Sequence, residues 1–292
     1  MSFQDALSLC ASQTEALLDR LLPADGAAAR RVVEAMRYSA LGQGKRLRPF
    51  LVVESAALFG VPREQALRVG VALECVHCYS LVHDDLPAMD DDALRRGKPT
   101  AHKAYDEATA ILAGDALLTI AFEILSDAAT HPDPDVRLRL ISGLAKAAGA
   151  AGMAGGQMLD IEAEKRETSD LGDIMRIQSL KTGALFRFAC EAGAIIGQAD
   201  PAPLRQYADN IGLAFQIADD ILDVESTPQA LGKATQKDKT KGKATFVDLL
   251  GLEGAKARAA ALTDEAVAAL RVYGDRAAIL GEAARFMVAR RK

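Results

Sequence analysis

Apolar residues recur at helical spacing along almost the whole chain. One stretch that follows the i, i+3, i+4 rule contains Leu204, Tyr207, Ala208, Ile211, Ala214, Phe215, Ala218 and Leu222. Four turn-forming sequences interrupt this pattern: 22–26, 60–62, 131–134 and 200–203. Each is as short as an ordinary connection between helices. The pattern therefore predicts an all-α fold with a single domain over residues 1–292.

Composition supports the helical prediction and narrows the function classes. Half of the 292 residues are hydrophobic, which is enough for a sizeable core, and only 5% are aromatic. Ala, Leu, Glu, Arg and Lys dominate, and all of them favour helix. The net charge of −5 argues against a nucleic-acid partner, because such proteins are usually basic.

The chain shows no clear targeting or membrane signal. Residues 1–20 predict an amphipathic helix, because no basic region is followed by an apolar block. The longest apolar stretches are interrupted by charge or glycine before they reach membrane-spanning length. We expect a cytoplasmic protein without stable membrane insertion.

The four cysteines, Cys10, Cys75, Cys78 and Cys190, do not indicate a zinc site. Cys75 and Cys78 have the spacing of half a site, but the second half is missing. Both also fall inside an uninterrupted helical pattern, so we expect buried cysteines in a helix.

Two acidic clusters carry the strongest chemical signal. They read Asp84-Asp85-Leu86-Pro87-Ala88-Met89-Asp90 and Asp219-Asp220-Ile221-Leu222-Asp223, and each follows an apolar helical run. Carboxylates on apolar helices are costly to bury without a counter-charge. Facing each other across a helical bundle, the clusters would hold two or three Mg²⁺ ions, with Mn²⁺ as an alternative. Cations held in this way suit the oxygens of a diphosphate.

The two clusters differ in regularity. Asp219 and Asp223 are one turn apart and share a face, with Gln216 on nearly the same stripe. In the first cluster, Pro87 is expected to kink or end the helix, which would bring Asp90 back beside Asp84. The alternative for both clusters is a solvated acidic face.

Basic residues near the clusters provide candidate anion contacts. Lys45 and Arg48 stand at a helix break, and Arg95 and Arg96 follow the first cluster. His77 shares the face of Asp84 two turns away, although a histidine packed in the core is the ordinary alternative.

Two further basic segments follow later in the chain. Lys181-Thr182-Gly183 interrupts an apolar helix, so we expect local loosening there. The segment from Gly232 to Lys243 is rich in lysine and predicts a basic loop.

These motifs together resemble those of the trans-isoprenyl diphosphate synthases, most closely the bacterial farnesyl diphosphate synthases. The resemblance runs from Gly44-Lys45-Arg46-Leu47-Arg48-Pro49, through both acidic clusters, to the basic loop. It implies a bundle of about ten helices around a central cavity, usually in a homodimer. It also implies a reaction in which an allylic diphosphate ionises and isopentenyl diphosphate attacks it.

The resemblance assigns roles to individual residues. Metal ligands are Asp84, Asp90 and Asp219, with Asp85 and Asp223 as indirect partners. The allylic diphosphate is contacted by Arg95, Lys181 and Lys233, and Lys243 covers the substrate-binding site. Isopentenyl diphosphate is contacted, without metal, by Lys45, Arg48, His77 and Arg96. Thr182 and Gln216 lie near the developing cation, and the released diphosphate accepts the proton.

Product length is the finest prediction, and we place it at fifteen carbons. Ser80 lies one turn below Asp84 on the same face, which leaves that level open. Helical geometry places Tyr79 about 140° around from Asp84. The resemblance therefore carries the assignment of Tyr79 as the floor of the tail cavity. The alternative is a tyrosine that packs against a neighbouring helix.

Other functions remain as alternatives. Within the family these are geranyl and geranylgeranyl diphosphate synthases. A terpene cyclase has only one diphosphate to hold, so the second cluster and the Lys45 and Arg48 pair argue against it. A non-catalytic synthase subunit is expected to have lost motif aspartates, and none is missing here.

Overall fold

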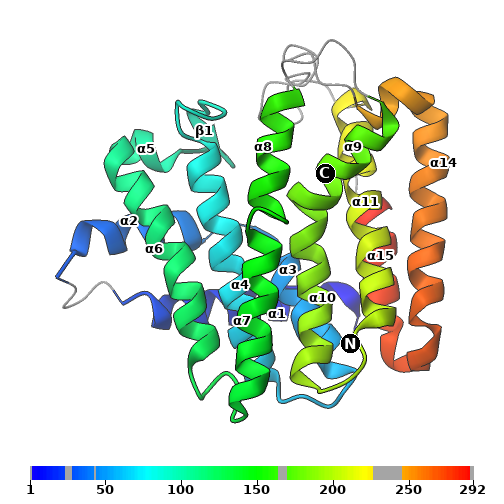
Figure 1. The fold of residues 1–292 in the computed structure, drawn as a ribbon, viewed down its shortest axis with the longest axis horizontal. Helices are drawn as coiled ribbons and strands as arrows, with labels where there is room; N and C mark the ends of the chain where they lie inside the picture. Colours follow the sequence, from blue (N-terminus) through cyan, green and yellow to red (C-terminus); the bar gives the residue numbers. More distant parts are fainter. Residues whose placement is uncertain (1, 24–27, 43, 164–169, 226–244, 290–292) are drawn as a thin grey trace. The chain divides into compact units, whose positions relative to one another are not determined.

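The computed structural model describes residues 2–23, 28–42, 44–163, 170–225 and 245–289. Contacts divide the chain into two compact units, Met1–Ile141 and Ser142–Lys292. Helices make up nearly all the regular structure of both (Figure 1), which confirms the all-α prediction. The single domain over residues 1–292 stays a prediction.

The first unit contains helices and one small hairpin. Its elements are α1 (Phe3–Leu21), α2 (Arg30–Ala40), α3 (Leu47–Ala57), α4 (Arg63–Asp84), β1 (Leu94–Arg95), β2 (Lys98–Pro99), α5 (Ala101–Ala104) and α6 (Glu107–Ser126). Helix α7 (Pro134–Ala148) contains the boundary between the two units.

Helix α4 forms the centre of the first unit. Most of its residues from Ala66 to Val82 are buried, as expected of a helix that is apolar on nearly all sides. It packs chiefly against α6 and α3, and Figure 1 shows α4 and α6 side by side. At Gly70 a Cβ would lie 3.0 Å from the Cα of Pro49, so glycine permits the close approach of α3.

Helix α6 corrects one expectation. An 18-residue window in Glu107–Ser126 has a mean hydropathy of 1.8, so this helix is long and apolar enough to cross a membrane by length and composition. Asp115 and Gly114 interrupt the stretch, but two such residues do not lower the average enough. The core helix of a globular unit passes the same test, and 44% of this window is buried.

The hairpin between β1 and β2 is a second departure from the sequence pattern. Leu94 pairs with Pro99 and Arg95 with Lys98 in antiparallel register. Arg96 and Gly97 form the turn with φ values of +52° and +78°, which fits the type I′ turn of two-residue hairpins. Strands of two residues are too short to show an alternating pattern.

In the described residues of the second unit, all the regular secondary structure is helical. Its elements are α8 (Met153–Ala163), α9 (Leu171–Gln178), a π-helical turn η1 (Ser179–Gly183), α10 (Ala184–Ile196), α11 (Ala202–Glu225), α14 (Phe246–Ala269), the 3₁₀ segment η2 (Leu270–Ala277) and α15 (Ala278–Ala289). Helix α11 packs most extensively on α14 and α10. Its buried Tyr207 donates a hydrogen bond of 2.8 Å to the carbonyl of Leu280 on α15.

The sequence breaks and the cysteines agree with expectation. Helices end or begin at all four predicted interruptions. The four cysteines are buried and free. Burial raises the pKa of Cys10 to about 11 and that of Cys78 to about 12, so both thiols stay protonated at neutral pH.

Candidate active site

The first acidic cluster lies where α4 ends. The helix stops at Asp84, three residues before Pro87, as the ring of proline predicts. The chain then turns back, and the backbone N–H of Asp90 donates to the carbonyl of Asp84 over 2.8 Å. Both residues are half-buried. The structure thus brings Asp90 beside Asp84, as expected.

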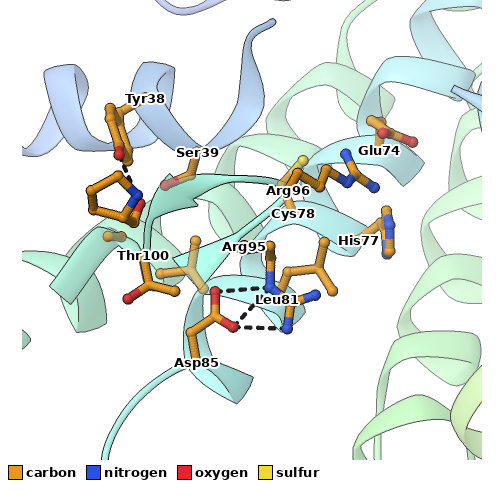
Figure 2. Close-up of a pocket in the computed structure, with 13 residues that line it drawn as sticks. Tyr38, Ser39, Glu74, His77, Cys78, Leu81, Asp85, Arg95, Arg96 and Thr100 are labelled. Carbon is orange, nitrogen blue, oxygen red and sulfur yellow. Dashed lines mark hydrogen bonds and ion pairs between the residues drawn. The ribbon is translucent and has the colours of Figure 1, made fainter. Parts of the chain in front are cut away.

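The middle aspartate of this cluster has a different environment. Asp85 is only 3% exposed. It accepts from Nε of Arg95 at 2.7 and 2.9 Å, while Nη2 of Arg95 lies 2.7 Å from Oδ1. Figure 2 shows this fork of contacts. The short hairpin carries Arg95, so Asp85 fixes the position of a predicted diphosphate contact.

A small pocket of about 40 Å³ lies next to this ion pair. Helix α4 contributes Glu74, His77 and Cys78, and the hairpin contributes Arg95 and Arg96. In Figure 2 the guanidinium of Arg96 points toward Glu74, whereas Arg95 turns toward Asp85. The two neighbouring arginines therefore serve different parts of the site.

Glycine shapes one wall near Arg96. A Cβ on Gly44 would lie 2.5 Å from Nη1 of Arg96, and the φ of Gly44 is +102°. Any larger residue would be strained there and would displace the guanidinium. The segment that carries Lys45 and Arg48 thus approaches Arg96 closely, as their common assignment to one substrate requires. Lys45 is exposed and Arg48 is half-buried.

Buried Arg46 holds this segment in place. It is 3% exposed, has a left-handed φ of +50° and caps α3. Its guanidinium donates to Glu74 over 2.6 Å, to Glu15 over 2.8 Å and to the carbonyl of Ala40. Removing one partner of a buried pair costs about 3–5 kcal/mol. Arg46 and Glu74 therefore connect the cationic segment firmly to α4.

The electrostatics of the pocket favour an anion. Burial, together with the charges of Arg48 and Arg96, lowers the pKa of His77 well below 6.5, so the imidazole is neutral at pH 7. Burial also lowers the pKa values of Arg48 and Arg96, and the negative charge of Glu74 opposes this shift. Several guanidinium groups around a neutral histidine suit a diphosphate that is bound without metal.

The two residues predicted to set product length lie on α4. Tyr79 and Ser80 are both half-buried. Burial and, to a smaller extent, the negative charge of Asp84 raise the pKa of Tyr79. The hydroxyl of Ser80 donates to the carbonyl of His77 over 2.9 Å. This leaves only a small side chain at that level of the helix.

In the second unit, Lys181 and Thr182 stand on the π-helical turn. Such turns often mark functional sites, and this one provides the local loosening expected at Gly183. Nζ of Lys181 lies 2.7 Å from Oδ2 of Asp160, which is 8% exposed on α8. A Cβ on Gly156 would lie 2.2 Å from the backbone nitrogen of Lys181. Close packing on α8 therefore supports the turn.

The second acidic cluster lies on α11. Asp219 is half-buried and Asp223 is exposed. Between them, Asp220 is 8% exposed and accepts from Nε2 of Gln216 at 3.1 Å and from the backbone N–H of Phe246 at 2.9 Å. Gln216, predicted to lie near the cation, is thus oriented by a carboxylate of its own helix.

Four residues without a predicted role support the site: Arg46, Glu74, Asp160 and Asp220. Asp220 belongs to a quoted motif, and Glu74 stands three residues before His77 in an apolar run. The sequence signal that could have identified Glu74 is a charged residue in an apolar helical run, about one turn from a predicted substrate contact. Lys233 and Lys243 lie outside the described residues, and the predicted facing of the two clusters stays a prediction.

Carboxylate oxygens are the ligand type that a hard divalent cation prefers. Within the part of the chain that the structure describes, no group of three or more His, Cys, Asp or Glu residues could hold a metal ion. Magnesium commonly takes only one or two carboxylates and completes its shell with water and substrate phosphates. The pair Asp84 and Asp90 is a donor set of this kind.

The chain is similar to known proteins over most of its length. The polyprenyl synthetase family matches residues 29–273. Farnesyl diphosphate synthase of Escherichia coli (strain K12) is 47% identical over 280 residues, which cover 94% of this chain and 93% of the relative. A geranylgeranyl diphosphate synthase of Cyanophora paradoxa is 41% identical, over 89% of this chain and 87% of the relative.

A solved structure extends the similarity to the fold. It is an FPP/GFPP synthase from Zymomonas mobilis, 52% identical, with a TM-score of 0.90 over 98% of this chain and 99% of that one. The similarity spans both units and both acidic clusters. The chain belongs to the polyprenyl synthetase family.

Proposed function

We propose that this chain is a farnesyl diphosphate synthase that adds isopentenyl diphosphate to dimethylallyl diphosphate and then to geranyl diphosphate. The observation that carries the proposal is that α4 bears two different anion-binding chemistries. His77 belongs to a cationic pocket with Arg96, and Asp84 ends the same helix in a carboxylate cluster. An enzyme with two diphosphate substrates needs both, whereas a cyclase needs one.

The carboxylates serve the allylic substrate. Asp84, Asp90 and Asp219 hold divalent cations, Mg²⁺ by their oxygen chemistry, with Mn²⁺ as a possible substitute. When bound, the metal neutralises the diphosphate as it leaves. Arg95 and Lys181 add positive charge, and their partners Asp85 and Asp160 fix where that charge points. Lys233 is proposed to contact the same diphosphate, and Lys243 is proposed to cover the substrate-binding site.

The remaining groups hold the second substrate and the developing cation. Lys45, Arg48, His77 and Arg96 bind isopentenyl diphosphate without metal. The C1–O bond of the allylic substrate breaks with its electron pair on the diphosphate, and the double bond of isopentenyl diphosphate attacks C1. The oxygens of Thr182 and Gln216 stabilise the positive charge. The released diphosphate then accepts the proton that is lost.

We propose fifteen carbons as the main product length, with Tyr79 as the floor of the tail cavity. The farnesyl diphosphate synthase of Escherichia coli, 47% identical to this chain, supports this choice. The Zymomonas and Cyanophora relatives are synthases of products that include longer chains, so a geranylgeranyl product is the second candidate. We also propose a cytoplasmic homodimer, as the resemblance implies.

A product assay tests the proposal. The purified chain is incubated with Mg²⁺, isopentenyl diphosphate and dimethylallyl diphosphate, and the dephosphorylated products are separated by chromatography. We expect mainly fifteen-carbon product, and none when EDTA replaces Mg²⁺. Tyr79→Ala should lengthen the product to twenty carbons or more, and Ser80→Phe should shorten it to ten. Mainly twenty-carbon product from the unmodified enzyme would contradict the chain-length assignment.

A further inference from the structure

His83 bridges helices α4 and α6 one residue before the first acidic cluster. Its Nε2 lies 3.1 Å from the carbonyl oxygen of Ile111 and 4.0 Å from Oδ1 of Asp115. A Cβ on Gly114 would lie 2.1 Å from the same nitrogen and 2.5 Å from Cδ2. The imidazole therefore rests directly on the bare backbone of α6, and only glycine at position 114 leaves room for it.

The His83 ring also contacts the ring of Tyr79. The two residues are four apart on α4, so they stand on the same stripe one turn apart. Their ring centroids are 5.7 Å apart with an interplanar angle of 76°, the edge-to-face arrangement that aromatic rings prefer. A chain of contacts thus runs from Ile111 and Gly114 through His83 to the phenol ring.

This chain of contacts restricts the Tyr79 ring. Tyr79 is half-buried, so burial alone does not hold it in a single rotamer. With the imidazole fixed on α6, a rotation of the phenol toward α6 would collide with it. Without the imidazole, that space opens and the ring can swing aside.

We propose that His83 is a positioning residue that braces Tyr79 against α6 and thereby sets the length of the prenyl product. The inference rests on the proposed function, in which Tyr79 closes the tail cavity. It assigns His83 no contact with substrate. Gly114 is part of the same packing arrangement, because any side chain at this position would displace the imidazole of His83.

The test measures the ratio of twenty-carbon to fifteen-carbon product in three variants. His83→Ala removes the brace, and we expect the ratio to rise by about tenfold or more, the size of effect that one pocket contact gives. Gly114→Ala should change the ratio in the same direction. His83→Phe keeps a ring against Tyr79 but loses the bond to Ile111, so its ratio should lie between those of the unmodified enzyme and His83→Ala.

Two controls separate positioning from general damage. Gly143→Ala is a matched glycine substitution in α7, where a Cβ would lie 3.1 Å from the Phe188 ring, and it should leave the ratio unchanged. The ratio does not depend on total turnover, so a slower His83 variant remains informative. If His83→Ala is too unstable to purify, Gly114→Ala and His83→Phe decide the question.

The outcomes distinguish this inference from the proposal on which it rests. A shifted ratio in Tyr79→Ala with an unchanged ratio in His83→Ala and Gly114→Ala would overturn the role of His83 alone. An unchanged ratio in Tyr79→Ala would overturn the floor assignment and the brace together. Absence of any condensation by the unmodified enzyme would overturn the proposed function.

Discussion

The two acidic clusters share a pattern of burial but differ in what the buried carboxylate holds. In each Asp-Asp pair the first residue, Asp84 or Asp219, is half-buried, and the second, Asp85 or Asp220, is buried. Asp85 binds the guanidinium of Arg95. Asp220 instead accepts from the amide of Gln216 and from the backbone of α14.

This difference separates two kinds of support. Asp85 positions a cation that we propose as a diphosphate contact, so its effect should appear in substrate binding. Asp220 receives the first N–H of α14, a group without a partner inside that helix, so its effect should appear in stability. Adjacent aspartates in a motif are therefore not equivalent, and the partner of each predicts its role.

The largest expected effect concerns the first aspartates. Asp84→Ala or Asp219→Ala should lower turnover by about 10³-fold or more, because stabilisation of the leaving diphosphate acts on the transition state. Steady-state rates with saturating Mg²⁺ measure this, and circular dichroism checks that the helices remain. Near-normal turnover of either variant would remove that residue from the metal site.

The cations should sort by substrate. Arg48→Ala and Arg96→Ala should raise KM for isopentenyl diphosphate by about tenfold or more, the size expected for a lost charged hydrogen bond. Lys181→Ala should act mainly on KM for the allylic substrate. Varying each substrate in turn measures both constants. Equal changes in both constants for all three variants would mean that the two pockets are wrongly assigned.

Smaller effects are expected for the second aspartate of each pair, and they should differ in kind between Asp85 and Asp220. Asp220→Asn should lower the free energy of unfolding by about 1–3 kcal/mol, because one buried acceptor loses its charge. Asp85→Asn should instead raise KM for the allylic diphosphate, because Arg95 loses its fixed direction. Urea unfolding and kinetics are measured on both proteins. If both variants show the same change in unfolding free energy and the same change in KM for the allylic diphosphate, the two aspartates do not have different roles.

The smallest effect concerns pH. The pKa of His77 is lowered, so the imidazole is already neutral above pH 6.5 and carries no charge to lose as the pH rises. The kcat/KM for isopentenyl diphosphate is measured for the unmodified enzyme and for His77→Asn. The ratio of the unmodified value to the variant value should stay constant from pH 6.5 to about 8. A fall in that ratio across this range would show that a protonated His77 binds the substrate.

The sequence predicted the helices well because their signals are local. Apolar spacing and short breaks indicate where helices begin and end, and Pro87 correctly predicted that α4 ends nearby. The same local logic placed Asp90 beside Asp84. The expectation that no apolar stretch reaches membrane-spanning length was wrong for α6, because the mean hydropathy of an 18-residue window stays high despite Gly114 and Asp115.

The hydrogen bonds and ion pairs that position the site residues could not be predicted from local sequence patterns. Arg95 lies 10 residues from Asp85 along the chain, and Phe246, one of the two partners of Asp220, lies 26 residues from it. Lys181 lies 21 residues from Asp160. Only the folded backbone brings these groups together. The motif itself marks candidate ligands, but their positioning depends on tertiary contacts that leave no local pattern.

The central claim is that both clusters act on one leaving diphosphate, and a double-variant cycle tests it most directly. Turnover is measured for Asp84→Ala, Asp219→Ala and the double variant, in single turnover with saturating Mg²⁺ and both substrates. Groups that act as a unit are strongly non-additive. We predict that the double variant is no more than about tenfold slower than the slower single variant. A double variant slowed by the full product of the two single effects would show that the clusters act independently and would contradict the account.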